Sequence, residues 1–215
     1  MIIQNYKLKR NMEKIGKIIL FILLGAVTLT ANAQSAAQAR QILDKAAAIV
    51  GHKSGAQAHF QMLSGKYGNT SGNIYIKGQK FHATTPQATV WYNGKTQWSY
   101  MKKTNEVNIS TPSDAQRMQM NPYSFINMYK NGYNLSMKDK GSSHEIHLVA
   151  QGKKSVPQMY IIVDKKTYVP GIIKVYQGGT WSSIIITGFK AKRLADSIFN
   201  FNAKDFPNAE LIDLR

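Results

Sequence analysis

Residues 72–100 of this chain read GNIYIKGQKFHATTPQATVWYNGKTQWSY, and this stretch decides the fold. Two runs rich in β-branched and aromatic residues each fold back over a glycine turn, at Lys77-Gly78 and at Asn93-Gly94. Asn-Gly between such runs is the strongest short-range hairpin signal, because both central residues of a type I′ turn need a positive φ. The stretch therefore predicts two consecutive antiparallel hairpins.

Alternation along each hairpin predicts one apolar face and one polar face. With Asn93-Gly94 as a two-residue loop, Trp91 is expected opposite Thr96, and Thr89 opposite Trp98. One face of the second hairpin then gathers its aromatic residues, Trp91, Trp98 and Tyr100. In the first hairpin the expected apolar face carries Ile74, Ile76, Phe81 and Ala83, and the other face carries Tyr75, Lys80 and His82.

The first 33 residues have the pattern of a secretory leader. Five basic residues precede an apolar run of 13, residues 18–30, and Ala31-Asn32-Ala33 is a small-x-small cleavage site. The mature chain is therefore expected to begin at Gln34, with Met12 as an alternative start to Met1. An uncleaved anchor is the other possibility, but this run is shorter than the about 20 apolar residues that span a bilayer.

Cleavage leaves residues 34–215, which correspond to a single domain large enough for its own core. The chain has no cysteine, which excludes disulfides, thiolate zinc sites, a cysteine nucleophile and a lipid anchor on cysteine. Without the leader, 23 basic and ten acidic residues give a net charge of +13. In an exported protein this charge favours an anionic lipid surface or an acidic partner over nucleic acid, and scattered solubilising lysines are the simpler alternative.

Outside the hairpins, alternating segments separated by short turns predict further antiparallel strands. They cover residues 58–63, 106–110, 133–137, 144–150, 159–163, 172–176, 181–187, 199–202 and 211–214. Two segments are helical instead, residues 35–50 with Ser35 as N-cap and Gly51 as its end, and a short helix that Pro122 opens.

About ten strands and two helices predict a mainly β fold. A single sheet of this size must curl or close, so we expect a strongly curved antiparallel sheet wrapped around its helices. Such a concavity leaves apolar volume for a ligand, whereas a filled β-sandwich, the alternative, does not.

No catalytic motif is recognisable in the sequence. His144 and His147 are three residues apart on an expected strand, so they face opposite sides and cannot share a metal ion. The acidic residues of the mature chain stand singly, and no GxSxG, P-loop or GxGxxG pattern occurs. These observations favour a binding protein over an enzyme and predict no cofactor.

Several segments in a fixed order resemble a known family. A leader and an amphipathic helix are followed by GNIYIKGQKF, VWYNGKTQWSY, EVNIS, NPYSFINMY and the C-terminal FNFNAKDFPNAELIDLR. In this order they are similar to the LolA-like periplasmic carriers of outer-membrane lipoproteins, over essentially the whole mature chain. NGKTQWSY and the F-x-F…P…IDL ending are the most specific pieces.

The resemblance implies an incomplete β-barrel of about eleven strands, with two or three helices covering an apolar concavity. It also implies a soluble periplasmic monomer that carries the acyl chains of lipoproteins from an inner-membrane ABC transporter to an outer-membrane acceptor. An arginine that latches the mouth in this family falls near Gly78-Gln79-Lys80, where Lys80 is the candidate substitute without the planar fork of arginine.

The expected acyl-binding lining is drawn from the apolar positions of the strands and of the second helix. It comprises Ile74, Ile76, Phe81, Trp91, Trp98, Tyr100, Val107, Ile109, Phe125, Ile126, Ile146, Leu148, Ile161, Val163, Ile173, Val175, Ile184 and Ile186.

Three other functions fit parts of the same pattern. A LolA-like paralogue that binds another lipid or apolar precursor shares every feature above. An envelope-stress module that restrains an anti-sigma factor uses a similar half-barrel but adds a second domain. A small outer-membrane barrel fits less well, because the second face carries Lys, Gln and Ser and the chain ends in Arg215.

Overall fold

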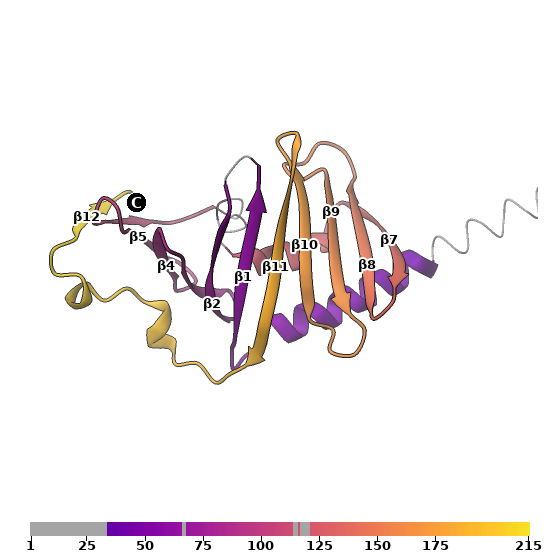
Figure 1. The fold of residues 1–215 in the computed structure, drawn as a ribbon, viewed down its shortest axis with the longest axis horizontal. Helices are drawn as coiled ribbons and strands as arrows, with labels where there is room; N and C mark the ends of the chain where they lie inside the picture. The colour runs from indigo at the N-terminus through magenta and orange to yellow at the C-terminus, as the bar shows by residue number, and fades with distance from the viewer. Residues whose placement is uncertain (1–33, 66–67, 114–115, 117–120) are drawn as a thin grey trace, which may run out of the picture.

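The computed structural model describes residues 34–65, 68–113, 116 and 121–215, so the expected leader, its cleavage site and both candidate start residues lie outside the described chain (Figure 1). The described part forms one 12-stranded sheet with the order β12-β6-β5-β4-β3-β2-β1-β11-β10-β9-β8-β7. The two ends of this order, β12 and β7, are not joined, so the sheet is open. The expected mainly β, incomplete-barrel fold is confirmed.

The sheet contains every strand that the alternation predicts except one. Its strands are β1 (Ala56–Ser64), β2 (Thr70–Lys77), β3 (Lys80–Thr84), β4 (Ala88–Tyr92), β5 (Gln97–Met101), β6 (Glu106–Ser110), β7 (Tyr133–Lys140), β8 (Ser143–Ala150), β9 (Gln158–Asp164), β10 (Pro170–Gln177), β11 (Thr180–Ala191) and β12 (Glu210–Asp213). An α-helix covers residues 34–50, and three 3₁₀ helices follow, η1 (Pro122–Lys130), η2 (Asp196–Phe199) and η3 (Ala203–Asp205). No helix in the described chain is long and apolar enough to cross a bilayer.

The two hairpins form, but each is displaced by two residues from the expected pairing. In β4–β5, Trp91 pairs with Trp98 rather than with Thr96, because the Asn93 side chain closes a four-residue loop. Its Oδ1 accepts the backbone N–H groups of Lys95 and Thr96 at 3.0 and 2.9 Å. A shift of two residues preserves the faces, so the expected grouping of the three aromatic residues on one face is confirmed.

In β2–β3 the loop is Gly78-Gln79 rather than Lys77-Gly78, and Lys77 pairs with Lys80. The two-residue loop needs a positive φ at its first central position, which Gly78 supplies at +60°. Lysine at that position would be strained. The expected faces of this hairpin are also retained, because Ile76 pairs with Phe81 and Ile74 with Ala83.

The predicted strand at residues 199–202 is wrong. Phe199 ends η2, and the following residues cross the sheet without joining it. The free edge of β6 is taken instead by β12, which pairs with it in parallel from Glu210 to Asp213. Phe201 packs its ring edge-on against Trp91 of β4, and Phe199 is completely buried, although neither residue pairs as a strand.

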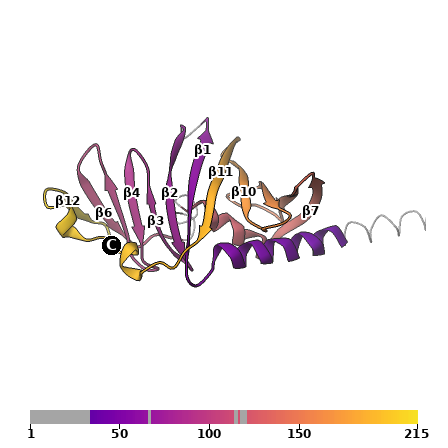
Figure 2. The ribbon, with the colours of Figure 1, turned by 60° about the horizontal axis from the view of Figure 1, so that its bottom comes forward.

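One face of the sheet, here called the inner face, packs against helix 34–50 (Figure 2). It is apolar from β7 to β4, as expected for a sheet that is covered on one side. The helix buries one stripe at i, i+3, i+4, i+7 and i+11, consisting of Ala39, Ile42, Leu43, Ala46 and Val50. Helix, η1 and inner face form one continuous core.

At the other end of the sheet the apolar side changes. Phe81 pairs with Tyr92, and His82 pairs with Trp91, so Trp91 lies on the face opposite to Phe81, here called the outer face. On β5 and β6 the inner-face positions are mostly polar, and the outer face carries Trp98, Tyr100, Val107 and Ile109. Two separate apolar surfaces therefore exist on one sheet.

We expect Gly72→Ala to destabilise the protein by about 1–3 kcal/mol, because a side chain there would overpack the junction of β1, β2 and β3. A Cβ on Gly72 would lie 1.9 Å from the carbonyl oxygen of Thr84 and 3.1 Å from the Phe60 ring. Gly171→Ala in β10 is the matched control, since nothing lies within 4 Å of its Cβ position. Urea unfolding measures both variants, and equal effects would contradict the close packing at Gly72.

Candidate functional site

The candidate site is the inner face beneath helix 34–50. On β8, β9 and β10 six of its side chains have no exposed surface at all, and they are Ile146, Leu148, Met159, Ile161, Val163 and Ile173. None of these side chains is charged, and together they offer dispersion contacts only. Chemically, such a surface can hold a hydrocarbon and nothing that needs a polar anchor.

Polar contacts along its length hold the helix in place. At its beginning, Ser35 Oγ accepts the backbone N–H of Met137 in β7 at 3.1 Å. In its middle, the Tyr129 hydroxyl of η1 donates to a carboxylate oxygen of Asp44. Beside that contact, the Lys45 ammonium donates to the Tyr168 hydroxyl at 3.3 Å and lies 4.5 Å from the ring centroid. A few hydrogen bonds at the beginning and in the middle of the helix thus hold this cover on the sheet.

Tyrosines of η1 and β7 support this cover from within the core. Burial raises the pKa of Tyr129 well above its usual range, and the hydrogen bond to Asp44 raises it further. Burial likewise raises the pKa of Tyr123, whose buried hydroxyl has no hydrogen-bond partner among the described residues. Tyr133 satisfies its hydroxyl on the carbonyl of Val156 at 2.9 Å. A neutral phenol at each position is what the apolar surroundings favour.

The inner face is not covered equally along its length. Where it passes from β11 to β1, Phe60, Ile184 and Ile186 keep 6–8% of their surface exposed, in contrast to the fully buried side chains of β8–β10. The neighbouring Met62 and Val90 are half-buried. Met62 of β1 and Val90 of β4 therefore bring apolar surface within reach of solvent, whereas Ile74, Ile76 and Phe81 on the strands between them are 0–2% exposed.

The outer face of β4–β6 has its own cover, formed by the segment between β11 and β12. Phe206 lies 5.6 Å from the Trp91 ring and 4.6 Å from the Tyr100 ring, measured between centroids. Phe201 approaches Trp91 edge-on at 5.5 Å. Phe199 of the same segment is completely buried. We call residues 192–209 the C-terminal strap.

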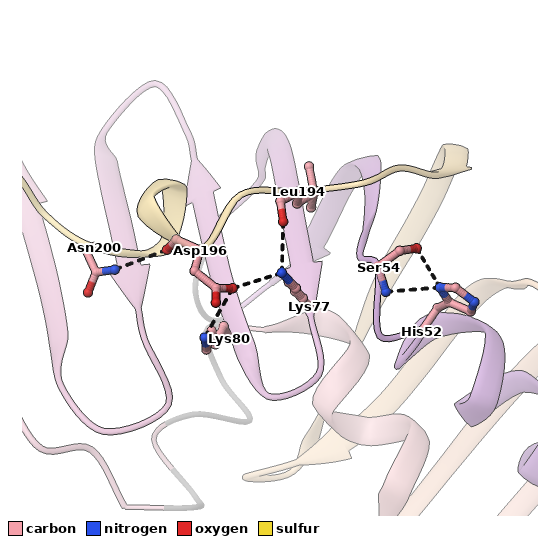
Figure 3. A network of polar contacts seen from close by, with 7 residues as sticks. All are labelled: His52, Ser54, Lys77, Lys80, Leu194, Asp196 and Asn200. Carbon is pink, nitrogen blue, oxygen red and sulfur yellow. Dashed lines mark hydrogen bonds and ion pairs between the residues drawn. The ribbon is translucent and has the colours of Figure 1, made fainter.

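Two lysines of the β2–β3 hairpin fasten this strap (Figure 3). Asp196 forms ion pairs with Lys77 at 3.0 Å and with Lys80 at 3.3 Å, and Lys77 also donates to the carbonyl of Leu194 at 2.9 Å. The hydrogen bond from Lys77 lowers the pKa of the Asp196 carboxyl below its usual range, and the hydrogen bond from Lys80 adds a smaller effect in the same direction. Lys80 thus fastens the strap, and its expected role as a latch of the mouth stays a prediction.

The structure divides the eighteen expected lining residues between two faces. Eleven lie on the inner face of strands, namely Ile74, Ile76, Phe81, Ile146, Leu148, Ile161, Val163, Ile173, Val175, Ile184 and Ile186, and Phe125 and Ile126 of η1 join the same core. The other five lie on the outer face, namely Trp91, Trp98, Tyr100, Val107 and Ile109. One concavity cannot contain both groups.

The model of the outer membrane lipoprotein carrier protein LolA matches residues 29–179. The chain belongs to this LolA family. The match includes the NGKTQWSY segment and stops before β11 and the C-terminal strap, which stand outside it. No curated protein matches the chain as a relative.

Several solved structures resemble the chain at low sequence identity. A conserved protein of Thermus thermophilus, described as uncharacterized, is 16% identical with a TM-score of 0.56, covering 82% of this chain and 99% of its own. A LolA superfamily protein from Nitrosomonas europaea is 13% identical, with a TM-score of 0.43 and coverages of 76% and 97%. A chain of the Pseudomonas aeruginosa MucA/MucB complex is 11% identical, with a TM-score of 0.45 and coverages of 78% and 62%. The first likeness supports the fold, and the other two are too weak to carry an argument.

Sequence reasoning missed the residues that fasten the two covers. Asp44 and Tyr129 are 85 positions apart, and Lys77 and Leu194 are 117 apart, so no local pattern connects them. The strap had a signal, the alternating phenylalanines before the last strand, but alternation alone indicates a strand rather than a crossing segment.

We expect Tyr129→Phe to loosen the helix, because it removes the hydrogen bond that the Asp44 carboxylate accepts from η1. The cost in unfolding free energy should be about 0.5–1.5 kcal/mol, the usual net contribution of one hydrogen bond. Hydrogen exchange of the helix amides should become faster than in the unmodified protein.

Tyr133→Phe is the matched control, since its hydroxyl bonds to Val156 and not to the helix. It should change the overall stability without a selective change in the helix. Equal helix exchange in both variants would contradict the role of Tyr129.

We expect Asp196→Asn to release the C-terminal strap, since the amide cannot form ion pairs with Lys77 and Lys80. Trypsin should then cleave faster after the exposed Lys204, with Glu210→Gln as the control substitution. Because the pKa of Asp196 is lowered in the folded chain, its stabilisation is fully present above the usual aspartate pKa of about 3.9 and is lost as the pH falls from there through the lower pKa of the folded state. Unchanged cleavage in Asp196→Asn would show that the strap is held without these ion pairs.

Proposed function

We propose that this LolA-family protein binds the acyl chains of lipoproteins on its inner face and carries them through the periplasm. The cargo would come from an inner-membrane lipoprotein-releasing ABC transporter and pass to the outer membrane, with an acceptor there if one exists. The observation that carries the proposal is a continuous apolar sheet face, from β7 to β4, covered by one amphipathic helix and η1.

Burial of the helix stripe and burial of one acyl chain stabilise by similar amounts, which supports an exchange of the helix for the acyl chain on the inner face. Transfer of acyl methylenes into water costs roughly 0.8 kcal/mol each, so one 16-carbon chain costs on the order of 10 kcal/mol. Ile42, Leu43 and Val50 are the large buried side chains of the helix stripe. At about 1.5–3 kcal/mol each, their burial amounts to roughly 5–9 kcal/mol. An acyl chain can therefore replace the helix on the inner face without a large net change in free energy.

The way the helix is anchored suggests how the site opens. Its C-terminal end continues through residues 51–55 directly into β1, whereas its beginning is held to β7 by the hydrogen bond between Ser35 and Met137. The beginning of the helix is thus the end that can move away from the sheet. Release of cargo is the reverse motion, and the purely apolar side chains beneath the helix keep it reversible.

The proposed carrier has no need of a catalytic centre, since the site supplies apolar contacts only. The leader would direct the chain to the periplasm, and a chain without cysteine has no residue for a lipid anchor on cysteine. A LolA-like protein that binds another apolar molecule would use the same inner face, so the identity of the cargo has to be measured. Native mass spectrometry of protein purified from the periplasm identifies what the inner face holds.

A reversible lock on the helix tests the site. The chain has no native cysteine, so the double variant Ser35→Cys, Met137→Cys can form only one intramolecular disulfide between the helix and β7. We expect the oxidised form to lose uptake of a fluorescent fatty acid and of a purified lipoprotein, and dithiothreitol to restore both. Mass spectrometry confirms the oxidation state of each sample.

Uptake by the oxidised protein at the rate of the reduced protein would place the ligand elsewhere than beneath the helix. Failure of the unmodified protein to bind either probe, together with no co-purified lipid, would refute the carrier function itself. The single variant Ser35→Cys controls for the loss of the hydroxyl.

A further inference from the structure

The outer face of β8–β11 carries an aromatic cluster that the carrier function does not use. It consists of His147, Tyr160, Tyr176 and Trp181, one residue from each of four adjacent strands. His147 and Tyr160 stack with their ring centroids 4.2 Å apart, and Trp181 lies 5.6 Å from Tyr160 and 5.3 Å from Tyr176. We call these residues the outer aromatic cluster.

Two exposed aliphatic side chains, Val149 and Leu63, border the cluster. Trp181 is 44% exposed, Val149 is 38% exposed and Leu63 is 36% exposed. Val149 is two residues beyond His147 toward the β8–β9 connection, on the same face of β8. Leu63 pairs with Ser183, which lies two residues from Trp181 toward the middle of β11, so Leu63 borders the cluster on β1. The cluster lies toward the end of the strands that carries the β8–β9 and β10–β11 connections, at the top of Figure 1. Large apolar side chains that gather on an exposed sheet face mark a contact surface.

The charge at this end has one sign. The segments 61–65, 68–73, 147–160 and 174–184 contain no aspartate or glutamate, and they carry Lys153, Lys154 and Lys174. Asp139, Glu145 and Asp164 lie toward the opposite ends of β7, β8 and β9. Asp139 pairs with Lys165 at 3.1 Å, and Glu145, on the same face of β8 as His147, pairs with Lys140 at 3.8 Å. The partner that complements this end is therefore anionic and has an apolar layer.

The chemistry distinguishes between anionic partners. The stack of His147 on Tyr160 covers one face of each ring, so these two faces are closed to a base or a sugar ring. Indole and phenol groups with a polar edge, beside aliphatic side chains and lysines, are the residues that the membrane–water interface favours. We propose that this end of the sheet docks on an anionic phospholipid surface, with Trp181 and Leu63 entering the headgroup layer.

The docking surface and the acyl site lie on opposite faces of the same strands. When the outer aromatic cluster contacts a lipid surface, helix 34–50 lies on the opposite, inner face of the sheet, away from that surface. The surface is therefore separate from the inner face, and its test does not depend on whether the inner face carries lipoproteins.

Sedimentation with sucrose-loaded vesicles tests the proposal on the full mature chain. Vesicles of phosphatidylglycerol and phosphatidylcholine in equal parts are compared with vesicles of pure phosphatidylcholine, at low and at high NaCl. We expect binding to the anionic vesicles that weakens with salt, and roughly tenfold weaker binding for Trp181→Ser, Leu63→Ser. Lys153→Gln, Lys174→Gln should weaken it by a similar factor.

Each variant has a matched control on another part of the molecule. Leu211→Ser, Leu214→Ser removes two exposed apolar side chains, 51% and 63% exposed, at the far edge of the sheet. Lys138→Gln, Lys166→Gln removes two exposed positive charges toward the opposite ends of β7 and β9. We expect both controls to bind like the unmodified protein. Circular dichroism of every variant confirms that it folds.

Three results would overturn the proposal. Equal binding to neutral and anionic vesicles would show that the positive charge of this end does not contribute to docking. Binding that survives Trp181→Ser, Leu63→Ser but is lost with the lysines would show attraction to any polyanion rather than to a lipid surface. Equal losses in test and control variants would show that no defined face docks.

Discussion

An open sheet with one apolar face must have that face covered, and this constraint organises the whole molecule. A sheet of twelve strands does not stay flat but curls. Along each strand every second side chain points to the same face, so one face collects the apolar residues. A closed barrel would cover the apolar face with its own opposite wall. Here β12 and β7 do not meet, so helix 34–50 and η1 take the place of that wall.

The two apolar surfaces have covers of different kinds. The helix stripe includes only three large side chains, Ile42, Leu43 and Val50, and an acyl chain offers the inner face about the same amount of apolar contact. Such a cover can be replaced, which is what a carrier without its own energy source requires. The C-terminal strap instead packs its phenylalanine rings on the outer face and is fastened to the β2–β3 hairpin by the ion pairs of Asp196. The strap therefore completes the fold at β4–β6.

Much of this could be predicted from the sequence alone. Period-two alternation and turn residues placed the strands of the sheet and the faces of both hairpins, because side-chain direction depends only on the parity of the pairing. The same signal placed one strand too many at residues 199–202, where the alternating phenylalanines belong to the strap. The apolar stripe predicted the first helix, and the order of the motifs indicated the family.

Only the tertiary structure decided which apolar residues share a face and which segment of the chain covers each face. Trp91 and Phe81 stand on adjacent strands and look equally suited to one lining, yet the pairing of His82 with Trp91 sends them to opposite faces. The contacts that fasten the helix and the strap join segments that are distant in sequence. Alternation specifies the two faces of each strand, but only the register between strands joins those faces into surfaces, and the register follows from loop geometry such as the Asn93 turn.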